Sequence, residues 1–222
     1  MPARYHGARR IDTVDLNPQM VDLVRARFAD FAGRLYDQPG VRIYTAEARG
    51  FVARIRTRYD LINVVLLDSF AASSAELYAV SESTLYTAEA LATYVRRLAS
   101  GGILAITRLL KLPPRDSLKM FATAVRALER LDVEAPGRRL VVVRSWNTVT
   151  LMVKNGEFTS HDVDLIEEFV EARGFDRAHH PGIEAADTNR NNVRYRPYLY
   201  EAATALLGPG RQAFLRDYKF HL

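Results

Sequence analysis

Apolar residues along the chain fall into two kinds of stretch. Short, nearly continuous apolar runs predict strands, and longer stretches with apolar residues three or four positions apart predict helices. The strand-like runs are residues 11–16, 41–44, 59–67, 103–107, 140–144 and 148–154. The helix-like stretches are residues 18–35, 46–56, 81–99, 114–131, 160–172 and 195–207.

This order of elements predicts the fold class. Strands alternate with helices along most of the chain, and only residues 145–147 separate the last two strand-like runs. We therefore expect an α/β fold with a doubly wound, Rossmann-like sheet that ends in an antiparallel hairpin. The apolar run 59–67 is expected to be covered on both faces, as in a parallel sheet. Residues 1–173 are predicted to form this domain, and residues 174–222 an appendage packed on it.

Composition excludes several classes of protein. The 222 residues include no cysteine, which excludes disulfide bonds and thiolate metal sites and fits the reducing cytoplasm. No apolar run reaches the roughly 18 residues that a membrane-spanning helix needs. The net charge of +5 comes from scattered arginines, so a solvated surface is favoured over binding to nucleic acid.

Three acidic residues follow three successive predicted strands, namely Asp15, Glu47 and Asp68. Ligands of open α/β sheets bind at the carboxyl ends of the strands. Asp15 could accept hydrogen bonds from ribose hydroxyls, and Glu47 one from an exocyclic amine such as adenine N6. The alternative is that each acid caps the helix that follows it. For the set of three, a nucleoside-binding site is the favoured interpretation.

Other polar residues give weaker signals. His179 and His180 are adjacent in sequence and have no acid cluster beside them, so we predict a loop or surface role and no metal site. The asparagine-rich stretch 189–192 is typical of a turn. Trp146 is expected at the turn of the hairpin.

The chain resembles the spermidine synthase family in four stretches: Val14-Asp15-Leu16-Asn17-Pro18, Ala46-Glu47-Ala48, Tyr59-Asp60-Leu61-Ile62 and Gly101-Gly102-Ile103-Leu104. Three further stretches are similar to its bacterial spermidine-synthase-like branch: Leu77-Tyr78, Tyr86-Thr87-Ala88-Glu89-Ala90 and Arg173-Gly174-Phe175-Asp176. The resemblance implies the fold of class I S-adenosylmethionine-dependent methyltransferases. Proteins of the bacterial branch often carry transmembrane segments elsewhere in the chain, so the residues here could be the cytoplasmic part of a membrane-associated protein.

The resemblance also implies an activity, the transfer of an aminopropyl group from decarboxylated S-adenosylmethionine to a small amine. By position, Asp15 matches the family's ribose-binding acid and Glu47 the acid that contacts adenine. The family has two aspartates after its next strand, one that deprotonates the amine and one that holds it. Counting without gaps from Asp60 places the first of these aspartates at Val65 and the second at Asp68. Valine cannot accept a proton, so Asp68 is the candidate catalytic residue.

Both ends of the chain depart from the family pattern. At the C-terminal end, Asp217-Tyr218-Lys219-Phe220 resembles the point just before the family's Asp-Asp-Arg-Pro stretch, so we expect a chain that stops early. In the family, a strand and a Gly-rich loop precede the strand that ends in Asp15, and residues 5–10 resemble the end of the helix after that loop. We therefore expect a fragment without the first strand and the loop, with unpaired edges on two neighbouring strands. Two alternatives to aminopropyl transfer stay open: a methyltransferase that uses S-adenosylmethionine, and a non-catalytic remnant or binding module. A homodimer is also left open.

Overall fold

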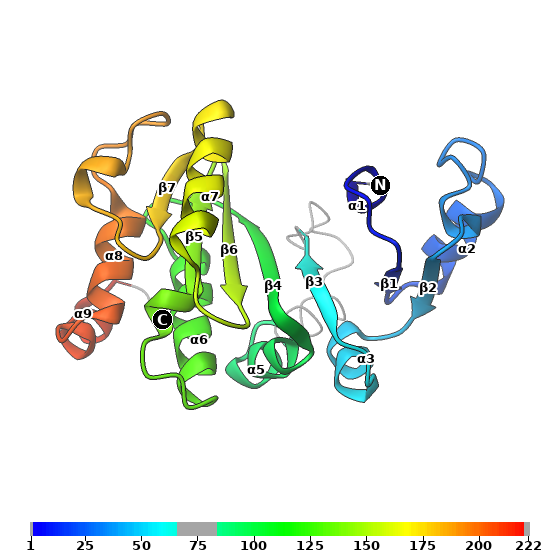
Figure 1. Cartoon of the computed structure of the whole chain (residues 1–222), viewed down its shortest axis with the longest axis horizontal. Coiled ribbons are helices and arrows are strands. Elements are labelled where there is room, and N and C mark those ends of the chain that lie inside the picture. Colours follow the sequence, from blue (N-terminus) through cyan, green and yellow to red (C-terminus); the bar gives the residue numbers. More distant parts are fainter. Residues whose placement is uncertain (1, 66–83, 220–222) are drawn as a thin grey trace. The chain divides into compact units, whose positions relative to one another are not determined.

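The computed structural model describes residues 2–65 and 84–219, which form two compact units (Figure 1). The first unit is Met1–Ile55 and the second is Arg56–Leu222. The sequence pattern did not predict a division at this point. Asp68 and the loop that follows it lie outside the described residues.

The first unit is built on a two-stranded parallel sheet. Strands β1 (Ile11–Asp15) and β2 (Val41–Thr45) pair in parallel, with the first residues of the two strands opposite each other and the last residues likewise. Within the described residues, β1 pairs with no other strand. The other elements of this unit are α1 (Pro2–Tyr5), α2 (Pro18–Ala26), the 3-10 turn η1 (Leu35–Asp37) and α3 (Ala48–Arg54).

Helix α2 begins as predicted but is shorter than predicted. The Asn17 side chain accepts hydrogen bonds from two amides of the first turn, and Pro18 occupies the first helical position, where its missing N–H costs nothing. The helix ends at Ala26. It cannot run on to residue 35 because Arg34 has a φ angle of 46°, in the left-handed region.

The second unit contains a five-stranded sheet in the order β3-β4-β6-β5-β7. Its strands are β3 (Tyr59–Val64), β4 (Leu98–Leu109), β5 (Leu140–Arg144), β6 (Thr148–Lys154) and β7 (Asp176–His179). β3 and β4 are parallel, and the other neighbouring pairs are antiparallel. The predicted hairpin is confirmed, with the bounds of both strands as expected.

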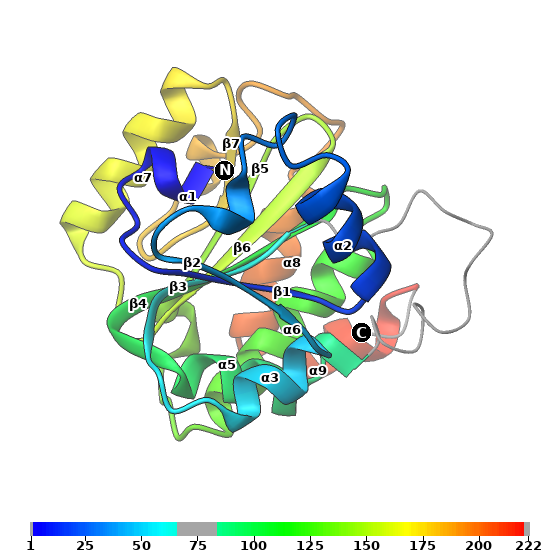
Figure 2. The ribbon, with the colours of Figure 1, turned by 90° about the vertical axis from the view of Figure 1, so that its right-hand side faces the viewer.

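Helices cover both faces of this sheet (Figure 2). They are α5 (Ala88–Arg96), α6 (Asp116–Glu129), α7 (Ser160–Ala172) and α8 (Tyr198–Leu207). Helix α9 (Arg211–Asp217) contacts α8, and the 3-10 turns are η2 (Pro136–Arg139) and η3 (Ala185–Asp187). On one face, Val170 of α7 packs in a buried cluster with Val141 and Val143 of β5. On the other face, α6 contacts β4, β6 and α8. The predicted α/β class is therefore confirmed.

Part of the segment 174–219 belongs to the sheet. β7 comes from this segment and pairs antiparallel with β5, and α8 packs on α6. The sequence pattern predicted neither β7 nor α9. No helix among residues 2–65 and 84–219 is long and apolar enough to cross a bilayer.

Two sequence-based expectations about burial are wrong. The strand at 59–67 was expected to be covered on both faces, but Leu61 of β3 is 54% exposed. His179 and His180 were expected in a loop or at the surface; His180 does lie in the loop after β7, but both side chains are buried. His179 lies in β7, and its Nε2 is 3.1 Å from the carbonyl oxygen of Gly137 in η2. Long-range pairing with β5 brings this histidine into the interior, so local composition could not reveal it.

Candidate functional site

Asp15 is the last residue of β1, at the carboxyl end of the strand. Its Oδ1 accepts a hydrogen bond of 2.8 Å from the amide of Asn17, so one carboxylate oxygen organises the turn into α2. Within the described residues, no hydrogen bond is made to Oδ2. The side chain is half-buried. Asp15 therefore retains an oxygen that can accept a hydrogen bond from a ligand hydroxyl.

Glu47 follows β2 and caps helix α3. Its Oε1 accepts from the amide of Arg49 at 2.8 Å, and its Oε2 accepts from the amide of Gly50 at 2.6 Å. The helix-cap alternative is thus correct for this residue. A carboxylate oxygen has two lone pairs, so each oxygen of Glu47 can accept a second hydrogen bond from a ligand. The cap holds the carboxylate in one orientation at the strand end.

The two acids lie at the same edge of the first unit. β1 and β2 are neighbouring parallel strands, and the carbonyl oxygen of Asp15 accepts a 3.0 Å hydrogen bond from the amide of Ala46, the residue before Glu47. Parallel strands present their carboxyl ends at one edge, where α/β proteins bind ligands. The structure therefore brings Asp15 and Glu47 together, as the sequence predicted. It does not test the third candidate, Asp68, which lies outside the described residues.

Val65 is the residue to which ungapped counting assigns the family's proton acceptor. It follows β3 directly and is 60% exposed. An aliphatic side chain offers no lone pair for a proton, so Val65 cannot act as a base. Among residues 2–65 and 84–219, no group of three or more His, Asp or Glu side chains is arranged to hold a metal ion.

A buried ion pair in the second unit was missed by the sequence analysis. Arg144, at the end of β5, lies with its Nη2 3.1 Å from Oδ2 of Asp176, at the start of β7, and both side chains are almost fully buried. Burial raises the pKa of the Asp176 carboxyl, but hydrogen bonds from Asn191 and Asn192 and the charge of Arg144 outweigh it and hold the pKa below its usual value. One sequence signal could have pointed to this ion pair: the backbone amides of the loop 189–192 need a hydrogen-bond acceptor.

Asp176 anchors that loop. Its Oδ1 accepts from the amides of Arg190 and Asn191, and its Oδ2 accepts from the amide and the side chain of Asn192. Arg144 Nη2 donates to the Oδ1 of Asn189 and to the carbonyl oxygen of Asn192. The predicted turn is confirmed, and the two charges fix its shape.

Comparisons with known proteins leave the family of the chain open. No family model matches it, and no curated protein matches it. Among solved structures, a probable spermidine synthase from Corynebacterium glutamicum is similar over 76% of this chain and 57% of its own, with 18% identity and a TM-score of 0.49. A spermidine synthase in complex with the transition state analogue AdoDATO is similar over 89% of this chain and 58% of its own, with 14% identity and a TM-score of 0.48.

A putative rRNA methylase from Clostridium thermocellum is similar over 67% of this chain and 74% of its own, with 14% identity and a TM-score of 0.38. The chain spans less than two thirds of the length of the two spermidine synthases.

Proposed function

We propose that the chain belongs to a spermidine-synthase-like enzyme of the class I methyltransferase fold, which transfers an aminopropyl group from decarboxylated S-adenosylmethionine to a small amine. One observation carries the proposal: Asp15 and Glu47 lie at the carboxyl ends of two adjacent parallel strands. Asp15 accepts hydrogen bonds from the ribose hydroxyls of the nucleoside, and Glu47 accepts one from the adenine amine. We place the enzyme in the cytoplasm, either alone or as part of a membrane-associated protein.

The proposed reaction is a displacement at carbon. The amine nitrogen of the acceptor attacks the carbon next to the sulfonium of decarboxylated S-adenosylmethionine, a C–N bond forms, and the C–S bond breaks. Methylthioadenosine leaves with the electron pair of that bond, and the proton of the amine passes to a carboxylate or to water. We assign the carboxylate to Asp68, because an acid beside a bound amine keeps the amine unprotonated when it attacks.

A binding experiment tests the nucleoside site. Methylthioadenosine is titrated into the whole chain by calorimetry, and then into Asp15→Asn and Glu47→Gln. Asp15→Asn retains an oxygen for the one backbone hydrogen bond of Asp15, and Glu47→Gln retains an oxygen for one of the two backbone hydrogen bonds of Glu47, so circular dichroism checks that each variant is folded. Each variant is expected to bind at least about tenfold more weakly, because a hydrogen bond to a charged group is lost. The matched control is Asp22→Asn, on the exposed face of α2, which should bind like the unchanged chain.

Equal affinity in all four proteins would remove Asp15 and Glu47 from the site. The reaction itself is tested with decarboxylated S-adenosylmethionine and putrescine, with the products identified by mass. A product that has gained an aminopropyl group supports the proposal. With S-adenosylmethionine as donor, a product that has gained only a methyl group would instead identify a methyltransferase.

A second candidate function is a non-catalytic nucleoside-binding module. The observation that favours it is Val65, which occupies the position of a proton acceptor without being able to accept a proton. This module would bind methylthioadenosine through Asp15 and Glu47 and yield no product with either donor. If the unchanged chain turns over either donor and Asp68→Asn abolishes that turnover, the non-catalytic module is excluded.

A further inference from the structure

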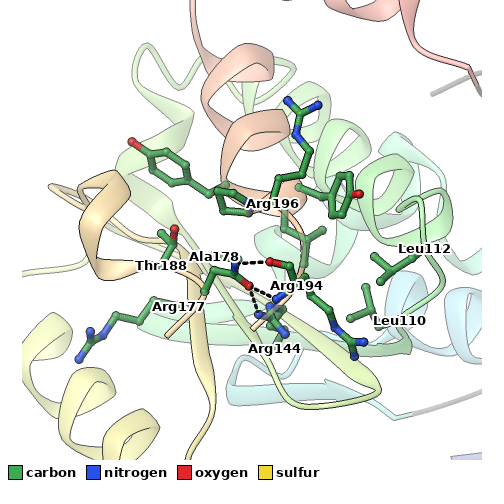
Figure 3. A pocket seen from close by; sticks show the side chains of 13 residues that line it. Leu110, Leu112, Arg144, Arg177, Ala178, Thr188, Arg194 and Arg196 are labelled. Carbon is green, nitrogen blue, oxygen red and sulfur yellow. Dashed lines mark hydrogen bonds between the residues drawn. The ribbon is translucent and has the colours of Figure 1, made fainter. Parts of the chain in front are cut away.

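A pocket in the second unit is lined by four arginines and no acid (Figure 3). It lies where β4 ends, β5 ends and α8 begins. The arginines are Arg144, Arg177, Arg194 and Arg196, and apolar side chains including Leu110, Leu112 and Leu199 line the remainder. In Figure 3 the two labelled leucines lie on one side of Arg144 and Arg194, and Thr188 lies on the other.

Three of the four arginines have a carboxylate partner. Arg144 pairs with Asp176 at 3.1 Å, and Arg196 pairs with Glu201 at 2.7 Å. Arg177 lies 3.8 Å from Glu167 and from Glu171.

Arg194 has no such partner among residues 2–65 and 84–219. Its Nη2 donates to the carbonyl oxygen of Trp146 at 2.7 Å. The pocket therefore carries one positive charge that no described carboxylate neutralises.

Three guanidinium nitrogens of the pocket arginines are buried and make no hydrogen bond within the described residues, namely Nη1 of Arg144, Nε of Arg177 and Nε of Arg194. Nε of Arg177 has the carboxylate of Glu167 3.8 Å away, whereas Nη1 of Arg144 and Nε of Arg194 have no such neighbour. The Arg144 side chain is only 7% exposed, and leaving a buried N–H of a charged group without an acceptor is costly. Burial lowers the pKa of Arg144, and the charge of Arg194 lowers it further, against the opposing effect of Asp176. An anion between the two guanidinium groups would relieve both penalties.

Helix α8 adds to the positive electrostatic potential of the pocket. Its first residues, Tyr198 and Leu199, line the pocket, and its N-terminal cap residue, Pro197, makes no side-chain capping bond. The N-terminus of a helix carries a partial positive charge and favours a nearby anion. The pocket also lies at the carboxyl end of β4, the sheet edge at which α/β proteins bind ligands.

We propose that this pocket binds the carboxylate of a small organic acid, held by Nη1 of Arg144 and Nε of Arg194. A single uncompensated charge matches a monoanion, so a carboxylate fits the pocket better than a doubly charged phosphate. The arginine fork suits the planar geometry of a carboxylate. Leu110 and Leu112 give a short apolar chain a surface to lie on.

The loop that shapes the pocket is already fixed before a ligand binds. Arg194 donates its amide to Oδ1 of Asn189, and Asn189 donates its side-chain amide back to the carbonyl oxygen of Arg194, each at 2.8 Å. Asn189 also accepts from Arg144 at 2.9 Å. Because these bonds hold both arginines in place, binding costs little additional ordering. This site is independent of the proposed nucleoside site.

The test is a titration of the whole chain with 4-methylpentanoate at low ionic strength, followed by calorimetry or amide chemical shifts. The neutral 4-methylpentanamide, acetate and inorganic phosphate serve as comparison probes. We expect 4-methylpentanoate to bind with a dissociation constant of about 1 mM or tighter and acetate to bind more weakly. The amide should not bind. Binding of the amide as tight as that of the acid, or tighter binding of phosphate, would overturn the assignment.

Two variants place the binding at this pocket. Arg194→Gln should weaken binding at least about tenfold, because a charged donor is lost. Leu112→Glu, at a 46% exposed position, should weaken it similarly by placing a competing carboxylate at the pocket. Arg126→Gln is the matched control, since it removes the same charge from the exposed face of α6.

Circular dichroism checks that each variant is folded. Unchanged binding in folded Leu112→Glu and Arg194→Gln, equal loss in Arg126→Gln, or no binding of 4-methylpentanoate to the unchanged chain would each refute the proposal. Retained binding of methylthioadenosine in Arg194→Gln keeps this result separate from the proposed function.

Discussion

Buried His179 makes the second unit sensitive to mild acid. Its ring packs edge-on against Phe121, with centroids 5.5 Å apart, and its Nε2 is 3.1 Å from the carbonyl oxygen of Gly137. Loss of solvation and, to a smaller extent, the neighbouring His180 lower the pKa of His179 from 6.5 to about 4, against the opposing effect of the bond to the carbonyl of Gly137.

The sign of the effect follows from proton binding. Below pH 6.5 the unfolded chain binds a proton on His179 that the folded chain refuses until about pH 4. The contribution of His179 to the free energy of unfolding is therefore complete above pH 6.5 and is lost as the pH falls toward 4. At about 1.4 kcal/mol for each pH unit, the loss is about 1.4 kcal/mol at pH 5.5 and, because the folded chain begins to bind the proton near pH 4, about 3 kcal/mol at pH 4.

The assay is urea unfolding followed by the fluorescence of Trp146, the single tryptophan, which lies in the second unit. Carboxylates also titrate in this range, so the measurement compares the unchanged chain with His179→Gln, whose side chain can still donate to Gly137 and carries no proton-linked charge. His161→Gln, on the exposed face of α7, is the control. The free energy of unfolding of His179→Gln should fall less between pH 7 and pH 4, by about 3 kcal/mol. Equal falls in all three proteins would refute the buried, neutral state of His179.

Three further substitutions have expected effects on stability. Thr159→Ala removes the cap of α7, where the Thr159 side chain accepts from the amide of Asp162 at 3.2 Å, and should cost about 1 kcal/mol in urea unfolding, without loss of the folded state. Leu104→Ala empties a fully buried position in β4 and should cost about 2–5 kcal/mol by the same measurement, and a cost below about 1 kcal/mol would contradict the packing described. Gly40→Ala would place a Cβ 2.3 Å from the carbonyl oxygen of Arg9 at a φ of +80°, so it should speed amide hydrogen exchange in the first unit while leaving the second unit unchanged.

The elements predicted correctly are those whose signals are local. The hairpin and helix α7 were predicted with their bounds, because the apolar runs 140–144 and 148–154 and the helical spacing of apolar residues in 160–172 each lie within one stretch of sequence. β7 was missed because its four residues, Asp176–His179, include three with polar side chains. Their burial depends on Arg144, Glu167 and Gly137, which are distant in sequence.

The same distinction holds for the candidate sites. Asp15 and Glu47 could be predicted, because each follows its own strand and the parallel pairing of neighbouring strands places both at one edge. The competing cap reading of Glu47 was equally local, and the structure shows that the carboxylate does cap α3. The pocket at Arg144 and Arg194 could not be predicted, since a fold is needed to bring the end of β5 beside a loop after β7.

The place of β7 in the sheet has a consequence for synthesis of the protein on the ribosome. Strand β5 pairs with β6 on one side and with β7 on the other. A nascent chain can form the β5–β6 hairpin well before β7, which covers the other edge of β5, has emerged. During that interval, the backbone amides and carbonyls of Val142 and Val143 lack their partners in β7. An exposed apolar edge of this kind recruits strands from other chains. Products of premature termination near Arg173 would retain the open edge and should associate with each other or with chaperones.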